Sequence, residues 1–197
     1  PVGIMKTPAD GLIATVAETC RATHNTSIAI SAAAAVATVV SCGLDGMGWR
    51  EAVRRGIEAA SRAEGEGVWI AGGKLSARIA WALDLAAKAR TADEIADMFA
   101  LIGTSVASQE SVPAAFATLA LAQGDAWRAA VIAANLGGDT DTIGAIAGSM
   151  AGACSGMASL PADKIARLHG FDAVAAADLA ERLVRARLGV EPGGRDG

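Results

Sequence analysis

The chain has 197 residues, of which 52% are hydrophobic and 19% are charged, and its formal net charge is −4. This composition excludes an intrinsically disordered chain, because it supplies enough apolar surface for a sizeable core. The acidic balance and the lack of a basic cluster argue against a nucleic-acid-binding protein. Cys20, Cys42 and Cys154 are too widely spaced for a disulfide framework and indicate a reducing compartment, the cytoplasm.

Two apolar stretches raise the question of a membrane span. The run from Ser27 to Val40 falls short of the roughly 18–20 residues that a span needs. The run over 142–160 is long enough but consists mainly of Gly, Ala and Ser, and neither run has a basic flank or an aromatic belt. The start, Pro1-Val2-Gly3, has no charged segment typical of a signal peptide. We therefore expect neither a membrane span nor a signal peptide.

The abundance of Ala, with no Tyr and 4% aromatic residues, predicts an all-α protein. Eight or nine helices with short connections are expected, without a convincing pair of strands. The expected helices cover residues 7–22, 27–42, 49–63, 74–90, a segment from 91, 111–123, 125–134, 142–156, a short turn from 161, and 173–188.

Local signals set the boundaries of these helices. Thr7-Pro8 places a capping residue before a proline at the first helical position, and Thr91 with Glu94 forms a capping box. Ser111-Val112-Pro113 indicates another helix start. The helix over 27–42 is apolar on nearly every side, so we expect it at the centre of the core.

Gly144, Gly148, Gly152 and Gly156 recur every four residues in the expected helix over 142–156. Such a stripe costs roughly 1 kcal/mol of helix propensity per glycine relative to alanine. In lipid it would be a dimerisation ridge, whereas in a protein core it lets another helix approach closely. We favour the protein core and expect this helix to be buried on nearly all sides.

The strongest chemical signal lies in the segment from Asn135 to Gly144, where Asp139 and Asp141 alternate with two threonines at an expected helix start. Inside a helix the two carboxylates would point to nearly opposite sides. At a loop-to-helix junction the backbone can turn both toward one point, and Gly137-Gly138 permits the backbone angles that this needs. Oxygen-only ligands suit hard cations, namely Mg²⁺, Mn²⁺ or Ca²⁺.

Helix capping is the alternative interpretation of these residues, because Asp and Thr are favoured at helix starts and the helix dipole stabilises negative charge there. A calcium loop of the EF-hand type is not expected, since the third acid and the later Glu are missing. A phosphate loop is not expected either, because no Gly-Lys-Ser/Thr follows. On spacing alone, cation binding and capping both stay open.

Residues 137–148, Gly-Gly-Asp-Thr-Asp-Thr-Ile-Gly-Ala-Ile-Ala-Gly, resemble the C-terminal metal motif of the ADP-ribosylglycohydrolase family. That family includes the hydrolase that reactivates ADP-ribosylated dinitrogenase reductase, and relatives that act on ADP-ribosyl-arginine and ADP-ribosyl-serine. Pro1-Val2-Gly3, Thr23-His24 and Gln109–Ala115 resemble further family segments, in the expected order along nearly the whole chain. The resemblance implies a compact, orthogonal, multi-helix all-α fold.

The resemblance also implies that Asp139, Asp141 and Thr142 are ligands in a site for two divalent cations, Mg²⁺ or Mn²⁺. The implied reaction is hydrolysis of the N- or O-glycosidic bond that joins ADP-ribose to a protein side chain or to a small conjugate. No catalytic acid or base is named, because the family's candidates lie in segments that this sequence lacks. The linkage and the preferred cation stay open.

Three other residues are candidates for lesser roles. The family resemblance favours His24 as a substrate-binding residue, with a capping or packed histidine as the alternative. Trp69, in a glycine-rich loop, is expected to pack against the protein, with stacking on adenine as the alternative. Glu110 either marks a helix start or is an acid that lies behind the metal ligands.

The sequence departs from the family pattern at its beginning. The Gly-Asp-x-x-Gly segment and the Thr-Asp-Asp-Thr motif, which supply the other metal ligands in the family, do not occur. We therefore expect residues 1–188 to be the C-terminal portion of a single domain, followed by a flexible tail over 189–197. Such a chain carries about half of the metal site and little activity alone, and the missing half, as a separate chain, is an expected partner.

A non-catalytic protein is the main alternative, since some relatives of this family serve as lens crystallins and a fold does not oblige a chemistry. It would bind ADP-ribose without turnover or act as a structural protein, and an inactive fragment is a further possibility. The intact Asp139-x-Asp141-Thr142 motif favours the enzyme.

Overall fold

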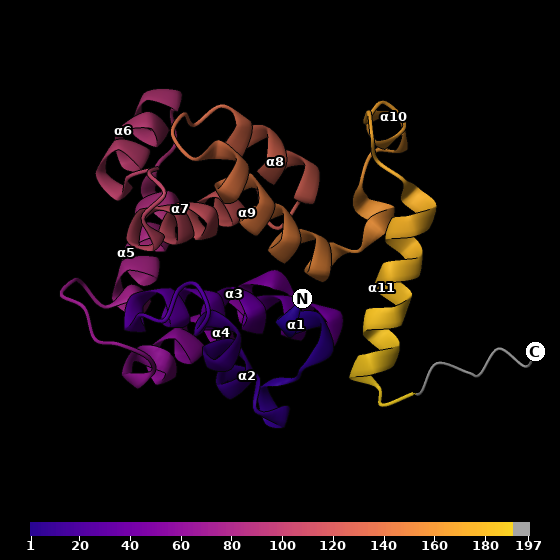
Figure 1. Ribbon diagram of the computed structural model, residues 1–197. Helices are drawn as coiled ribbons and strands as arrows, with labels where there is room; N and C mark the ends of the chain where they lie inside the picture. Colours follow the sequence, from indigo (N-terminus) through magenta and orange to yellow (C-terminus); the bar gives the residue numbers. More distant parts are fainter. Residues whose placement is uncertain (191–197) are drawn as a thin grey trace, which may run out of the picture.

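The computed structural model describes residues 1–190, and Figure 1 shows that the elements in this part of the chain are helices. The predicted all-α fold is confirmed, with an isolated bridge between Thr26 and Val68 as the one extended pairing in the described part. The α-helices are α1 (Val2–Met5), α2 (Leu12–Cys20), α3 (Ser27–Leu44), α4 (Trp49–Arg62), α5 (Leu75–Lys88), α6 (Ala92–Ile102), α7 (Ser108–Leu121), α8 (Ala126–Ala134), α9 (Thr140–Ser155), α10 (Ala162–Ile165) and α11 (Ala173–Arg187). Three short 3₁₀ helices are η1 (Pro8–Asp10), η2 (Ala63–Gly65) and η3 (Met157–Ser159).

Side-chain caps fix several helix starts where the sequence predicted them. The Thr91 hydroxyl accepts the backbone N–H of Glu94 at 3.2 Å, and the Glu94 carboxylate accepts the N–H of Thr91 at 3.0 Å. The predicted capping box is therefore confirmed. Asp125 caps α8 through the N–H of Arg128 at 2.6 Å.

The predicted helix over residues 7–22 is wrong in its extent. Thr7 does cap a helix start, but the helix is the short η1. Gly11, with a φ of +73°, then adopts the left-handed conformation and separates η1 from α2. The prediction of a cap at Thr7 is therefore correct, but the prediction of one continuous helix after it is wrong.

The apolar α3 is the central helix, as predicted. It contacts α1, α2, α4, α7 and α9, and Ile30, Ala34 and Val39 are fully buried. α3 continues to Leu44, and its 18 residues, with a mean hydropathy of 2.0, are long and apolar enough to cross a membrane. The expectation that this apolar run is too short for a span is therefore wrong. Since 61% of the window is buried within the structure, the place of α3 in the core accounts for its apolar sequence.

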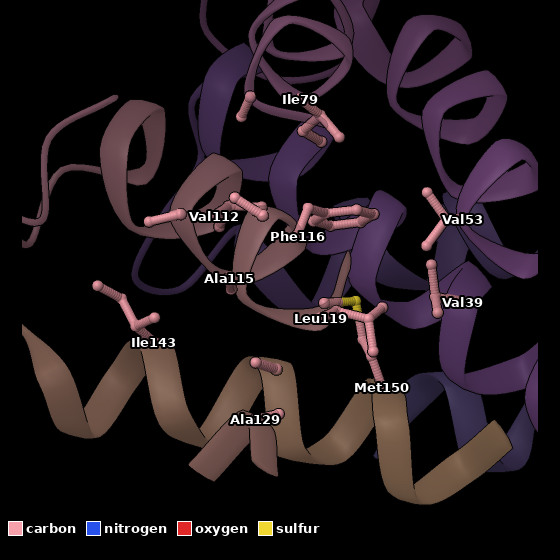
Figure 2. Close-up of a cluster of buried hydrophobic side chains, with 14 of the residues drawn as sticks. Val39, Val53, Ile79, Val112, Ala115, Phe116, Leu119, Ala129, Ile143 and Met150 are labelled. Atoms are coloured by element: carbon pink, nitrogen blue, oxygen red, sulfur yellow. The ribbon is translucent and has the colours of Figure 1, made fainter. Parts of the chain in front are cut away.

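Phe116 on α7 lies in the larger hydrophobic core (Figure 2). Its side chain is fully buried and points toward Val39 of α3 and Val53 of α4, with Ile79 of α5 close by. Burying a phenylalanine side chain contributes roughly 1.5–3 kcal/mol relative to exposure. Since α7 also contacts α8 and α9, it joins the N-terminal helices to the pair that carries the candidate site.

The start of α7 differs from the prediction. The helix begins at Ser108, three residues before Ser111, and Pro113 lies inside it. Proline has no backbone N–H, so the carbonyl of Gln109, four residues earlier, loses its helical donor. The Nε of Arg78 on α5 donates to that carbonyl at 2.6 Å and replaces the missing donor.

The prediction that α9 is buried on nearly all sides is wrong. A methyl group added at Gly148 or Gly152 would meet nothing within 4 Å. The buried face of α9 consists of Ile143, Ala147, Met150 and Ala151. The close helix approach occurs instead at Gly43 of α3, where a Cβ atom would lie 2.8 Å from the backbone carbonyl carbon of Ala153.

α11 stands to one side of the other helices, and its residues are exposed except for Leu183 and Arg187, which are partly buried (Figure 1). Arg187, at its C-terminal end, attaches it to the rest of the protein, and this side chain is only 7% exposed. The guanidinium donates to backbone carbonyls in and after α1, to the carbonyl of Ser41 at 3.3 Å and to the carboxylate of Asp45 at 2.7 Å. One arginine therefore provides the main polar attachment of this helix.

The predicted division into a domain over 1–188 and a tail over 189–197 stays a prediction. Most of that tail, residues 191–197, lies outside the described residues.

Candidate metal-binding site

The predicted metal ligands lie where the turn after α8 enters α9. Gly137-Gly138 has φ angles of +75° and +69°, which favour glycine. α9 begins at Thr140, two residues before the predicted start, so Asp141 and Thr142 occupy its first turn. Asp139 immediately precedes the helix. The fold therefore brings the three predicted ligands onto one loop-to-helix junction, which we call the α9 junction (residues 137–142).

Neither carboxylate of the α9 junction caps the helix. Asp139 occupies the N-cap position, but its side chain accepts no N–H from the first turn. At the starts of α8 and α11, by contrast, the carboxylates of Asp125 and Asp172 do accept backbone N–H groups. Asp139 is half-buried, Asp141 is exposed, and neither carboxylate forms a hydrogen bond or a salt bridge with residues 1–190. No capping hydrogen bond is therefore observed, although Asp141 lies in the first turn, where the helix dipole stabilises negative charge. The carboxylate oxygens are available to a ligand.

The α9 junction packs against the loop between α6 and α7. The backbone N–H of Asp139 donates to the carbonyl oxygen of Thr104 at 2.7 Å. A Cβ atom at Gly138 would overlap the same oxygen, so glycine is required for this close approach. Glu110 holds the loop from the other side, because its carboxylate accepts the N–H of Ser105 at 3.0 Å. Hydrogen bonds from the side chain and backbone of Ser105 lower the pKa of Glu110.

The donor set fits a hard divalent cation but does not complete its coordination. Asp139, Asp141 and Thr142 offer carboxylate and hydroxyl oxygens, which Mg²⁺ and Mn²⁺ prefer. An octahedral cation takes about six ligands, and residues 1–190 contain no group of three or more His, Cys, Asp or Glu side chains arranged for a metal. The other ligands of a cation at this junction would be water, substrate or a further polypeptide segment.

His24 does not join the carboxylates of the α9 junction. It lies in the loop between α2 and α3, exposed, with Nδ1 2.9 Å from the hydroxyl of Thr23. It lines one wall of a groove to which Ser108, at the start of α7, also contributes. The structure thus places the predicted substrate-binding residue and the predicted metal ligands on different elements, and of these residues only His24 lines the groove.

This groove has a volume of about 710 Å³ and runs between α1, α2, α3, α7, α9 and α11. Small apolar side chains dominate its walls, above all those on the open face of α3: Ala29, Ala32, Ala33, Val36, Ala37 and Val40. No Lys, Arg, Asp or Glu of the described residues lines it. Its walls therefore offer mainly apolar surface to an occupant.

The α9 junction directly precedes the part of α9 that lines the groove. Asp141, Ala145 and Ser149 follow one another at four-residue intervals and so share a face of α9. Ala145 and Ser149 line the groove, as does Ile146, which lies four residues after Thr142. Thr142 therefore shares the groove side of the helix and Asp141 lies at its edge, although neither side chain lines the groove. Sequence reasoning missed the groove, although the unbroken apolar surface of α3 was a signal for it.

Trp69 is 77% exposed, so the expectation that it packs against the protein is wrong. Its loop is tethered by Gln109, whose Nε2 donates to the carbonyl of Gly73 at 3.0 Å. The ring is therefore accessible to a stacking partner. Sequence reasoning also missed Thr104 and Arg78, because their contacts join segments far apart in the chain.

Comparison with known proteins agrees with the motif. A model of the ADP-ribosylglycohydrolase family matches residues 1–192. The uncharacterized protein YegU of Escherichia coli (strain K12) is 35% identical over 149 residues, which are 75% of this chain and 45% of that protein. The chain thus spans about half the length of the curated relative that it matches. The family is generally dependent on Mg²⁺ or Mn²⁺. Because the match extends over nearly the whole sequence, this chain belongs to the ADP-ribosylglycohydrolase family.

Proposed function

We propose that this chain supplies part of the active site of a metal-dependent hydrolase. The enzyme would cleave the N- or O-glycosidic bond of ADP-ribose in a modified protein side chain or in a small ADP-ribosyl conjugate. Family membership supports the reaction class. The observation that carries the proposal is the pair of carboxylates, Asp139 and Asp141, which neither cap α9 nor pair with a base in the described residues.

In this proposal Asp139, Asp141 and Thr142 hold their share of two divalent cations, Mg²⁺ or Mn²⁺. When bound, such cations would orient the ribose diol and polarise a water for attack at the anomeric carbon. The carbonyl of Thr104 fixes the backbone of Asp139, so less conformational entropy is lost on ligation. His24 contacts the substrate from the α2–α3 loop. No side chain of this chain is assigned as the acid or base.

We also propose that the groove receives an apolar helix from the part of the family protein that this chain does not match, on the same polypeptide or on a separate one. The alanine-rich wall of α3 would let a helix approach closely, and each Å² of apolar surface buried contributes roughly 25 cal/mol. Because Asp141 and Thr142 lie one helical turn before Ala145 and Ile146, which line the groove, such a helix would place one end near them. This arrangement would complete the ligand set that the chain alone leaves incomplete.

The cytoplasm is the compartment that we propose, because the three cysteines are all free thiols. Burial raises the pKa of Cys20, Cys42 and Cys154, which disfavours the reactive thiolate. They act as small packing residues and not as nucleophiles.

The proposal is tested by co-expressing this chain with the portion of the E. coli relative outside its matched region. Release of ADP-ribose from ADP-ribosyl-arginine and ADP-ribosyl-serine is then measured with Mg²⁺, Mn²⁺ or a chelator. We expect cation-dependent turnover by the pair, little by this chain alone, and loss of turnover in Asp139→Asn and Asp141→Asn. Asp84→Asn, an exposed acid on α5, is the control.

Two outcomes of this assay count against the proposal. Turnover that survives the chelator, or that Asp139→Asn retains in full, contradicts the role of the carboxylates. Binding of ADP-ribose by the pair without turnover favours the non-catalytic alternative.

A further inference from the structure

Glu110 is an acidic residue close to the α9 junction to which the proposed reaction gives no role. It is the third residue of α7, yet its carboxylate accepts the N–H of Ser105 in the preceding loop at 3.0 Å. A Cβ atom at Gly103 would overlap this carboxylate, so Glu110 fills the space that the glycine leaves open. The side chain is therefore packed into the α6–α7 loop.

The part of the loop that Glu110 holds is the part that supports Asp139. Thr104 lies between Gly103 and Ser105, the two residues that Glu110 contacts. Its carbonyl oxygen accepts the backbone N–H of Asp139 at 2.7 Å. Since the backbone of Gly138 also lies directly against Thr104, a displacement of Thr104 is transmitted to the α9 junction.

Arg78 fixes the two ends of the same loop. Its guanidinium donates to the carbonyl of Ile102, the last residue of α6, at 3.1 Å. It also donates to the carbonyl of Gln109, in the first turn of α7, at 2.6 Å. Arg78 thus holds the ends of the loop, and Glu110 holds the segment between them at Ser105.

We propose that Glu110 is a positioning residue for the α9 junction, which sets the place of Asp139 through Ser105 and Thr104 without touching a cation. This inference rests on the proposed function, because the position of Asp139 matters to a cation only if one binds there. Groups that orient metal ligands typically change metal affinity by 10–100-fold when they are replaced. Because Glu110 acts through two intervening residues, we expect the lower end, about 10-fold.

The test uses the full chain, labelled with ¹⁵N and titrated with Mn²⁺ alone. Broadening of the backbone amide signals of residues 139–143 gives an apparent Kd, and hydrogen exchange of the Asp139 amide reports its bond to Thr104. Glu110→Ala is expected to raise the Kd about 10-fold and to speed that exchange. Glu110→Gln, whose amide oxygen can still accept the Ser105 N–H, is expected to stay close to the wild type.

Asp84→Asn, on the exposed face of α5, is the matched control and should leave both readouts unchanged. Thermal unfolding verifies that each variant is folded. Should Glu110→Ala fail to fold, Glu110→Asp, which shortens the side chain by one methylene, provides the same comparison with Glu110→Gln.

Wild-type exchange at Asp139 together with a wild-type Kd in Glu110→Ala would overturn the positioning role. Equal impairment of the alanine and glutamine variants would overturn it as well, because the hydrogen bond would then not be the cause. The proposed function fails in a distinguishable way. If the wild type shows no localised broadening, or Asp139→Asn broadens as the wild type does, the cation site is absent and the positioning role falls with it.

Discussion

The guanidinium of Arg187, the last residue of α11, lies 2.7 Å from the carboxylate of Asp45, which follows the end of α3. The two residues are 142 positions apart in the sequence. Since every residue of α11 except Leu183 and Arg187 is exposed, Arg187 provides the main polar attachment of the helix. α11 also supplies Leu179 and Leu183 to one wall of the groove, so Arg187 indirectly determines where that wall stands.

Replacing Arg187 by Ala should release α11 from the body of the protein. The change removes several charge-assisted hydrogen bonds, but the Asp45 carboxylate is half-exposed and can be hydrated by water instead. We therefore expect the free energy of unfolding to fall by about 2–3 kcal/mol. Hydrogen exchange of residues 173–187, followed by mass spectrometry, should show reduced protection. Arg182→Ala, at a position that is 73% exposed, should leave protection unchanged. Equal protection in the two variants would show that α11 is held by other contacts.

Two glycine substitutions distinguish a tight helix crossing from an open helix face. Gly43→Ala places a methyl group against the backbone of Ala153 and should cost about 1–3 kcal/mol. Gly148→Ala adds a methyl group to open space in mid-helix and should stabilise by up to about 1 kcal/mol. Urea unfolding of the chain measures both. A destabilised Gly148→Ala variant would indicate that the glycine stripe is a packed surface after all.

The helix starts that the sequence predicted correctly are those in which cap and partner lie within a few residues. Thr91 bonds Glu94, and Asp125 bonds Arg128, so each capping hydrogen bond lies within one turn of the chain. The start of α7 was predicted incorrectly because Pro113 lies inside the helix, where the carbonyl of Gln109 that it leaves free accepts from Arg78, 31 positions away in the sequence.

The candidate site shows the same division. A short motif was enough to propose Asp139, Asp141 and Thr142 as ligands, and the structure places all three at one junction beside the Gly137-Gly138 turn. Their binding of a cation stays a prediction. The support of that turn by the α6–α7 loop could not be predicted, since no local pattern specifies which distant carbonyl receives an N–H. The prediction from the glycine stripe, that α9 is buried on nearly all sides, was wrong for a related reason. A repeat in the sequence describes the surface of one helix but does not show whether another helix packs against that surface.

Thr118 is a buried residue whose hydroxyl oxygen has no hydrogen-bond partner within the described residues. Thr118→Val replaces the hydroxyl by a methyl group of similar shape and should stabilise the protein by up to about 1 kcal/mol, because a buried polar group is removed. Ser31→Ala is the matched comparison and should destabilise by about 1 kcal/mol, since the Ser31 hydroxyl donates to the carbonyl of Ala60 at 2.7 Å. Thermal unfolding should separate the two variants in opposite directions. Destabilisation by Thr118→Val would mean that the hydroxyl is satisfied in solution.

The capping box of α6 predicts a specific pH dependence. Hydrogen bonds from the backbone N–H groups of Arg90 and Thr91 lower the pKa of Glu94. A lowered folded-state pKa gives stabilisation that is present above the unfolded-state pKa, about 4.3, and that is lost as the pH falls through the folded-state value. The difference in stability between the wild type and Glu94→Ala should therefore shrink as the pH falls below about 4.3. Urea unfolding at a series of pH values measures it, and a constant difference would contradict the ionic contribution.

The central claim is that the carboxylates of Asp139 and Asp141 bind a divalent cation, and anomalous diffraction from crystals of this chain soaked in Mn²⁺ tests it most directly. The account predicts an anomalous peak at coordination distance, about 2.1 Å, from carboxylate oxygens of the α9 junction, and its absence from crystals of Asp139→Asn. Mn²⁺ bound elsewhere while the junction stays empty, or a peak that Asp139→Asn leaves unchanged, would contradict the account.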